Sequence, residues 1–148
     1  MNTFQDAIDL DGPVVRVAIN MPAAFLMQMR RQAQPISPAV EVMALIDTGA
    51  DVSVFDPSVF VPLQPYGLVA GQALYVNAPG LGPITPVFEY FVSLEFPVGP
   101  PNPVKFGMIA VVERALGAMG YQALLGRDVL AACGFWYDGP GGRFTLAF

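Results

Sequence analysis

One aspartate sits where an apolar run meets a tight turn, and it is the first candidate for chemistry. Ala44-Leu45-Ile46 leads into Asp47-Thr48-Gly49, and a second acid, Asp51, follows four positions after Asp47. Gly49 lets other backbone approach closely because glycine has no Cβ. The hydroxyl of Thr48 can hold the turn. The tripeptide alone also fits a simple turn closed by an Asx hydrogen bond.

The chain lacks the residues that most other kinds of catalysis need. The chain has no His, which removes Ser-His and Cys-His catalysis and the commonest metal ligand. The one cysteine, Cys133, lies among apolar neighbours and is predicted to be a buried, inert thiol. The net charge is −5, and the seven basic residues form no stripe, so nucleic-acid binding is not expected. No metal or organic cofactor is predicted.

Hydrolysis of an amide by carboxylates needs a base to activate water and an acid to protonate the departing groups. Two carboxylates held close together share one proton and divide these roles. Only one turn here has the required type, because Asp11-Gly12 and Asp138-Gly139 are plain Asp-Gly turns. A pair of such turns would therefore need a second chain.

The elements that position Asp47 are predicted to be short strands. Apolar residues make up 54% of the 148, charged residues 13%, and 15 Gly and 15 Pro punctuate the chain without a period. Such a pattern favours a single all-β domain over residues 1–148. A short lead-in over 1–12 precedes these elements. We expect strands at 14–20, 40–46, 52–55, 68–77, 87–96 and 104–112, a short helix at 127–132, and a closing hairpin of 135–137 with 144–148.

Three further local features are predicted. Residues 21–38 form an insertion or long loop that contains either two helical turns or a strand arm. This segment borders a cleft, extends a surface between two chains or is itself cleaved. Asp56 caps a brief helix that starts at Pro57. The glycine-proline segment 77–83 joins two strands into a hairpin that is either a mobile flap or an ordinary surface hairpin.

Two motifs carry a resemblance to a known family. The segment Ala44 to Asp51 resembles the active-site segment of retropepsin-like aspartic proteases, and Leu124-Leu125-Gly126-Arg127-Asp128-Val129-Leu130 resembles their late Gly-Arg-Asp/Asn segment. The similarity in order and spacing extends over about residues 14–148. It implies a closed or partly open β-barrel of that type, with one short C-terminal helix and a flap hairpin.

The resemblance also assigns roles to residues. Asp47 is the expected catalytic residue, and Thr48 and Gly49 support its turn. Ala50 and Asp51 are expected to bind substrate together with the flap residues Gly80, Leu81 and Gly82. Arg127 is expected to form a structural ion pair with Asp51 through its planar fork of donors. Asp128 is interpreted as a helix or surface acid rather than a catalytic one.

The function implied is a homodimeric aspartic endopeptidase in which each subunit gives one Asp47 across a two-fold axis. The partners are then a second copy and a peptide or protein substrate. The alternative is a retropepsin-like dimerisation or peptide-binding module with little or no turnover. A purely structural β-sandwich would explain neither motif.

Membrane and export signals are not seen in the sequence. No stretch reaches the roughly 18 apolar residues of a membrane span. The N-terminal residues do not resemble a signal peptide, because they include Asp6, Asp9 and Asp11 and have no basic region before an apolar core. A cytoplasmic location is the default expectation.

Overall fold

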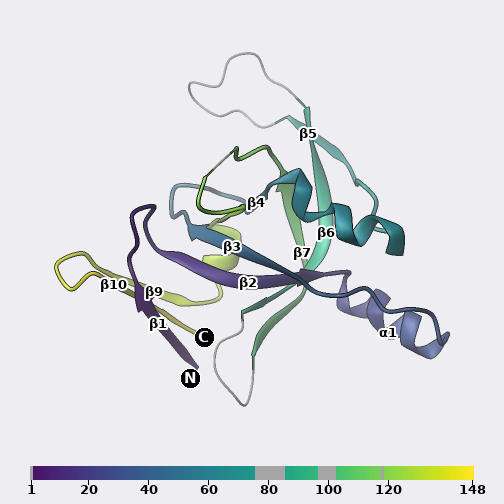
Figure 1. The fold of residues 1–148 in the computed structure, drawn as a ribbon, viewed down its shortest axis with the longest axis horizontal. Coiled ribbons are helices and arrows are strands. Elements are labelled where there is room, and N and C mark those ends of the chain that lie inside the picture. The colour runs from purple at the N-terminus through teal and green to yellow at the C-terminus, as the bar shows by residue number, and fades with distance from the viewer. Residues whose placement is uncertain (1, 76–85, 97–102, 118) are drawn as a thin grey trace.

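The computed structural model describes residues 2–75, 86–96, 103–117 and 119–148 (Figure 1). Helices and short 3-10 turns are few, and strands carry the fold. In chain order the elements are β1 (Thr3–Ala7), β2 (Val14–Asn20), α1 (Ala23–Arg31), β3 (Val40–Ile46), β4 (Val54–Phe55), η1 (Pro57–Val59), η2 (Val61–Tyr66), β5 (Ala73–Tyr75), β6 (Pro86–Phe96), β7 (Val104–Glu113), β8 (Ala123–Leu125), α2 (Arg127–Leu130), β9 (Gly134–Asp138) and β10 (Arg143–Ala147).

Six strands close into a barrel. Their order is β2-β3-β8-β4-β7-β6, and an additional pairing of β2 with β6 joins the two ends. β5 extends the sheet beyond β6 (Figure 1). Closure leaves these six strands without a free edge, which removes a common site of unwanted strand pairing. The predicted all-β barrel is confirmed.

Strands β2 and β3 owe their position to alternating apolar side chains. Val15, Val17 and Ile19 are buried on β2, and Val42, Ala44 and Ile46 are buried on β3. The two strands are antiparallel, with Val14 opposite Leu45. Burying each large aliphatic side chain contributes roughly 1.5–3 kcal/mol. Both strands have the predicted bounds.

The core continues from the barrel under the two 3-10 segments. Phe55, Phe60 and Leu63 are almost completely buried. The ring of Phe60 stacks on that of Tyr90 in β6, with centroids 4.2 Å apart and planes at 15°. The predicted cap is present, since the side chain of Asp56 accepts a hydrogen bond from the Ser58 amide and Pro57 follows at the first position.

A second sheet lies beside the barrel and corrects one prediction. Residues 1–12 were expected to be a lead-in, but β1 pairs along its whole length with β10, from Thr3 opposite Ala147 to Ala7 opposite Arg143. The expected closing hairpin is present as β9 and β10. The order β1-β10-β9 places β10 in the middle. The backbone partners of β1 lie far along the chain, so the residue pattern of β1 itself does not predict a strand.

Several segments settle or shift the predicted elements. The segment 21–38 contains a helix, α1, of nine residues, which was one of the two predicted alternatives, whereas the late helix α2, predicted over 127–132, ends at Leu130. The strand predicted from Leu68 begins at Ala73. The strand predicted from Val52 begins at Val54. Within the described ranges, no helix is both long and apolar enough to cross a lipid bilayer.

Candidate active site

Asp47 follows the last residue of β3, and backbone contacts fix its turn. The Asp47 amide donates to the carbonyl of Leu125 at 2.9 Å. Within the turn, the Gly49 amide donates to Asp47 Oδ1 at 2.9 Å, and the Ala50 amide donates to the Asp47 carbonyl at 3.2 Å. Asp47 is half-buried, whereas Thr48 and Gly49 are exposed. The carboxylate therefore stands in a defined orientation at the surface.

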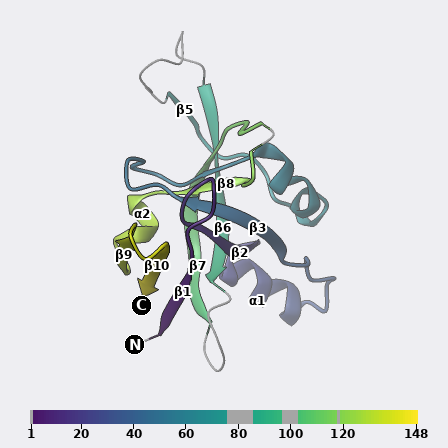
Figure 2. The ribbon, with the colours of Figure 1, turned by 60° about the vertical axis from the view of Figure 1, so that its left-hand side comes forward.

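The late segment passes between the two strands that flank this turn. β8 lies parallel to β3, with Leu45 opposite Leu124, and antiparallel to β4, with Val54 opposite Leu124. The expected Asp51–Arg127 ion pair had already linked these segments. The topology adds direct backbone pairing where the chain turns from β3 to β4, and Figure 2 shows β8 beside β3.

Gly126 makes the close approach possible. The Arg127 amide donates to the Ala50 carbonyl at 2.9 Å. A Cβ at Gly126 would lie 2.7 Å from the Val52 carbonyl carbon and 3.0 Å from the Ala50 oxygen. Both are backbone atoms that cannot rotate away. The backbone after β8 therefore packs directly on the segment that follows Asp47, and only glycine fits there.

Arg127 and Asp51 form an ion pair through Nη2 and Oδ1. Their side chains are 60% and 79% exposed, so water screens the attraction. Exposed pairs of this kind typically contribute about 0–1 kcal/mol. The pair joins α2 to the segment just after the turn, and its contribution to the stability of a single chain is small.

Ser53 was not singled out from the sequence, yet it joins three parts of the site. It is fully buried, and its hydroxyl donates to Asp128 Oδ1 at 2.7 Å. Its amide donates to Asp128 Oδ2 at 2.9 Å, and its hydroxyl oxygen accepts from the Gly126 amide at 3.0 Å. Asp128 therefore anchors α2 to the strand leaving the turn. One feature of the sequence could have indicated Ser53. Arg127 and Asp128 are adjacent, and Arg127 reaches Asp51 while Asp128 reaches Ser53.

Asp56 fixes the chain where β4 ends. Hydrogen bonds from the Ser58 hydroxyl, the Leu116 amide and the Ser58 amide lower the pKa of its carboxyl group, because each stabilises the ionised form. The Leu116 contact spans 3.0 Å and links η1 to the loop after β7. Asp56 thus helps to hold the strand that leads away from Asp47.

The flap residues Gly80, Leu81 and Gly82 lie outside the described residues. The strands leading toward them are described, and the Gly71 amide donates to the Glu89 carbonyl of β6 at 2.7 Å. Exposed aromatic side chains occur on both strands, namely Tyr75, Phe88 and Phe91. Apolar surface is therefore exposed on both β5 and β6.

Within the described residues, no group of three or more His, Cys, Asp or Glu side chains is arranged to hold a metal ion. Cys133 is half-buried, and burial raises the pKa of its thiol. A raised pKa reduces the thiolate fraction at neutral pH, and the thiolate is the nucleophilic form. Cys133 is therefore poorly suited to nucleophilic chemistry.

Comparison with known proteins identifies the fold. The chain matches no protein-family model and no curated protein sequence. Among solved structures, it is similar to a retropepsin-like aspartic protease from Rickettsia conorii, with 17% identity, a TM-score of 0.56, and coverage of 99% of this chain and 91% of that one. The chain has a retropepsin-like fold. The retropepsin-like barrel places Asp47 on the turn after β3.

A second solved structure, the retroviral protease-like domain of Ddi1 from Leishmania major, is 16% identical over 90% of this chain and 88% of that one, with a TM-score of 0.40. The retropepsin-like assignment rests on the Rickettsia structure.

Proposed function

We propose that the protein is a homodimeric aspartic endopeptidase in which the Asp47 carboxylates of two chains form the catalytic pair. The single observation that carries this proposal is the fixed Asp47 turn, in which the Gly49 amide holds Asp47 Oδ1 at 2.9 Å. The retropepsin-like fold supports it, and so does the contact of the turn with the segment 126–128, where the Arg127 amide donates to the Ala50 carbonyl.

The proposed reaction needs one proton shared by the two carboxylates. The ionised Asp47 removes a proton from water as the water oxygen bonds to the scissile carbonyl carbon. The protonated Asp47 of the second chain donates to the carbonyl oxygen, which becomes a hydroxyl. The first Asp47, which holds the proton taken from water, then gives it to the nitrogen, and the carbon–nitrogen bond breaks. As the amine leaves and the carbonyl re-forms, a hydroxyl of the intermediate returns its proton to the Asp47 of the second chain. Ala50, Asp51 and the flap residues 80–82 would hold the extended peptide through backbone hydrogen bonds.

The strand arrangement supports a particular dimer contact. β10 already has strand partners on both edges, β1 and β9, so it is not free to pair with a second chain. β9 and β1, at the two ends of this sheet, each have a strand partner on one side only within the described residues. Of these two edge strands, β9 carries exposed aromatic rings, since Trp136 and Tyr137 are 58% and 56% exposed, whereas Phe4 of β1 is half-buried. We therefore place the dimer contact at the β9 edge, where a second strand would lie beside both rings, one on each face of the sheet.

The dimer contact is tested with Tyr137→Lys, which places a charge on the pairing edge. Sedimentation of this variant should show monomers at concentrations where the parent chain is dimeric, and peptide cleavage should fall with dimerisation. Met108→Lys is the matched control, because Met108 is an exposed apolar residue of β7 at 63% exposure. If the Tyr137→Lys variant sediments as a dimer at the same concentrations as the parent chain, the interface does not lie at the β9 edge.

The activity is tested by incubating the purified chain with a peptide library and reading products by mass spectrometry. Cleavage should disappear in Asp47→Asn and with a pepstatin-type inhibitor, and should persist in Asp11→Asn, a change to an exposed acid outside the site. Specific peptide binding without cleavage, unchanged in Asp47→Asn, would instead establish the binding-module alternative. Activity should peak at mildly acidic pH, and a flat profile up to pH 8 would contradict the shared proton.

A further inference from the structure

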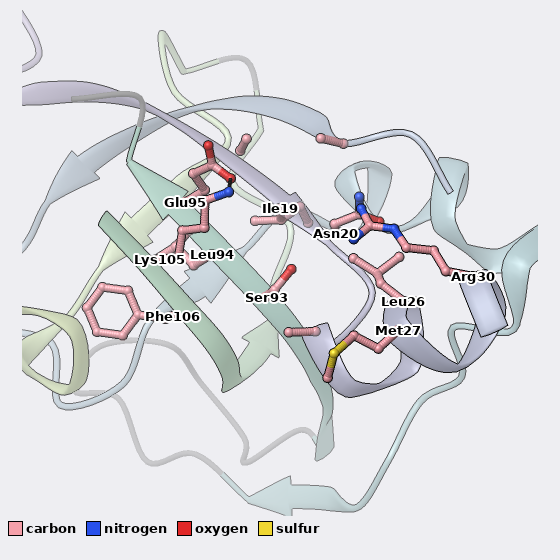
Figure 3. A pocket seen from close by; sticks show the side chains of 13 residues that line it. Ile19, Asn20, Leu26, Met27, Arg30, Ser93, Leu94, Glu95, Lys105 and Phe106 are labelled. Carbon is pink, nitrogen blue, oxygen red and sulfur yellow. Dashed lines mark ion pairs between the residues drawn. The ribbon is translucent and has the colours of Figure 1, made fainter. Parts of the chain in front are cut away.

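A cavity of about 290 Å³ lies between α1 and the end of the barrel formed by β2, β6 and β7 (Figure 3). This volume is near the lower limit of about 300–1,000 Å³ for small-molecule sites. Its accessible apolar side chains include Leu26, Met27 and Phe106, whereas Ile19 and Leu94, which also border it, are buried in the barrel core.

The cavity is remote from Asp47. Ala39, which lines it, immediately precedes β3, whereas Asp47 immediately follows the seven residues of that strand. At about 3.3 Å per residue, the strand separates the two by roughly 20 Å. A ligand in this cavity would not touch the carboxylate proposed to act on peptides.

Most polar side chains around the cavity are satisfied within the chain. Asn20 Nδ2 donates to the Ser37 carbonyl at 3.1 Å, and the Ser93 hydroxyl donates to the Met21 carbonyl at 2.9 Å. Lys105 Nζ lies 3.1 Å from Glu95 Oε2. These groups need no ligand to complete their hydrogen bonds.

Arg30 differs from the other polar groups. Its guanidinium has no ion pair and no side-chain hydrogen bond to the described part of the chain. It extends from α1 beside Asn20, at the end of the cavity away from the Glu95–Lys105 pair (Figure 3). An arginine fork matches the geometry of a carboxylate. Arg30 is exposed, so water solvates its free guanidinium. The cavity thus combines an apolar wall from α1 with one accessible cationic donor.

We propose that this cavity binds a small carboxylate with a short apolar tail. The tail lies against Leu26 and Met27 of α1, and the carboxylate pairs with Arg30. The opposite end is unfavourable for the anion, because the carboxylate of Glu95 already accompanies Lys105 there. The attraction between Arg30 and an anionic ligand is local, because the protein as a whole carries a net charge of −5 and does not attract anions. This proposal is independent of proteolysis.

The test is a titration of the ¹⁵N-labelled full chain with butanoate, hexanoate and octanoate, followed by amide chemical shifts. Saturable shifts should occur at 18–20 and 23–30, and binding should tighten with tail length. Octanol, which has the tail without the charge, should bind more weakly. Absence of saturable shifts at these residues with every carboxylate would overturn the proposal.

Arg30→Gln should weaken octanoate binding about fivefold, as expected for a partly solvated ion pair. Arg31→Gln is the matched control, because Arg31 belongs to the same last turn of α1 but does not line the cavity. Ala23→Leu, which fills space in the cavity, should weaken octanoate more than butanoate. Equal weakening by Arg30→Gln and Arg31→Gln would overturn the role of Arg30, whereas unchanged binding in Asp47→Asn would separate this site from the proposed catalytic pair.

Discussion

Asp128 binds Ser53 twice, through the Ser53 amide at 2.9 Å and the Ser53 hydroxyl at 2.7 Å, although the two residues are 75 positions apart. This relationship joins α2 to the strand that leaves the Asp47 turn. The Gly126 amide completes the arrangement by donating to the same serine hydroxyl. A buried hydroxyl with both donor and acceptor functions used is difficult to replace.

Ser53→Ala should lower the free energy of unfolding by about 1–3 kcal/mol, because it leaves the Gly126 amide without its acceptor in a buried site. Chemical denaturation measures this change. Ser58→Ala is the control, since its hydroxyl also donates to a carboxylate but is exposed, and it should cost less. Equal costs would show that the buried hydroxyl of Ser53 does not anchor α2.

The ion pair of Arg127 and Asp51 should matter more to the proposed dimer than to the single chain. Because both side chains are mostly exposed, Arg127→Lys should change the unfolding free energy of the chain by less than about 1 kcal/mol. Lysine cannot reproduce the planar fork, so we predict weaker dimerisation and activity.

The Arg127→Lys variant is compared with Arg16→Lys, because Arg16 forms another exposed pair, with Glu41. A double-mutant cycle with Asp51→Asn then isolates the coupling of Asp51 and Arg127. Sedimentation and peptide cleavage provide the readouts. Unchanged dimerisation and activity in Arg127→Lys would show that the ion pair with Asp51 does not support the dimer.

Gly126→Ala should destabilise the fold by about 1–3 kcal/mol, in the range of overpacked sites. The added Cβ would meet backbone atoms of Val52 and Ala50. Gly107→Ala is the matched control, because its Cβ would lie 3.5 Å from the Ala23 Cβ, an ordinary contact distance. Thermal unfolding of the two variants compares them directly. An unfolding midpoint of Gly126→Ala equal to that of Gly107→Ala would show that the backbone at residue 126 can move away from Ala50 and Val52 without loss of stability.

Asp56 should give the fold a pH-dependent contribution. Its folded-state pKa is lowered from 3.8, so its stabilisation is present above about pH 3.8 and is lost as pH falls through the lower folded value. Asp56→Ala should cost about 0.5–2 kcal/mol at pH 7, as for other cap replacements. Urea unfolding at pH 7 and pH 2.5 measures the cost. A difference between parent and variant that persists undiminished at pH 2.5 would exclude ionised Asp56 as its source.

Local signals in the sequence determined much of the fold. Alternating apolar residues placed β2 and β3, and a continuous aromatic and β-branched run placed β6. The Asp56-Pro57 pair placed the start of η1, and the Asp-Gly and Gly-Gly dipeptides placed the closing hairpin. In each case the residues that determine the structure are neighbours along the chain, so their pattern is visible without the fold.

The tertiary structure decided what depends on distant partners. β1 was not predicted, because an edge strand uses backbone groups that every sequence has, and its partner β10 lies at the other end of the chain. Ser53 became important only when Asp128 and Gly126 were brought to it. The choice of helix for α1, and the cavity that it forms with the barrel, likewise depended on packing. The sequence alone specified the Asp47 turn, but the threading of β8 between β3 and β4 fixed the turn in space, because its hydrogen-bond partners come from residues far away in the chain.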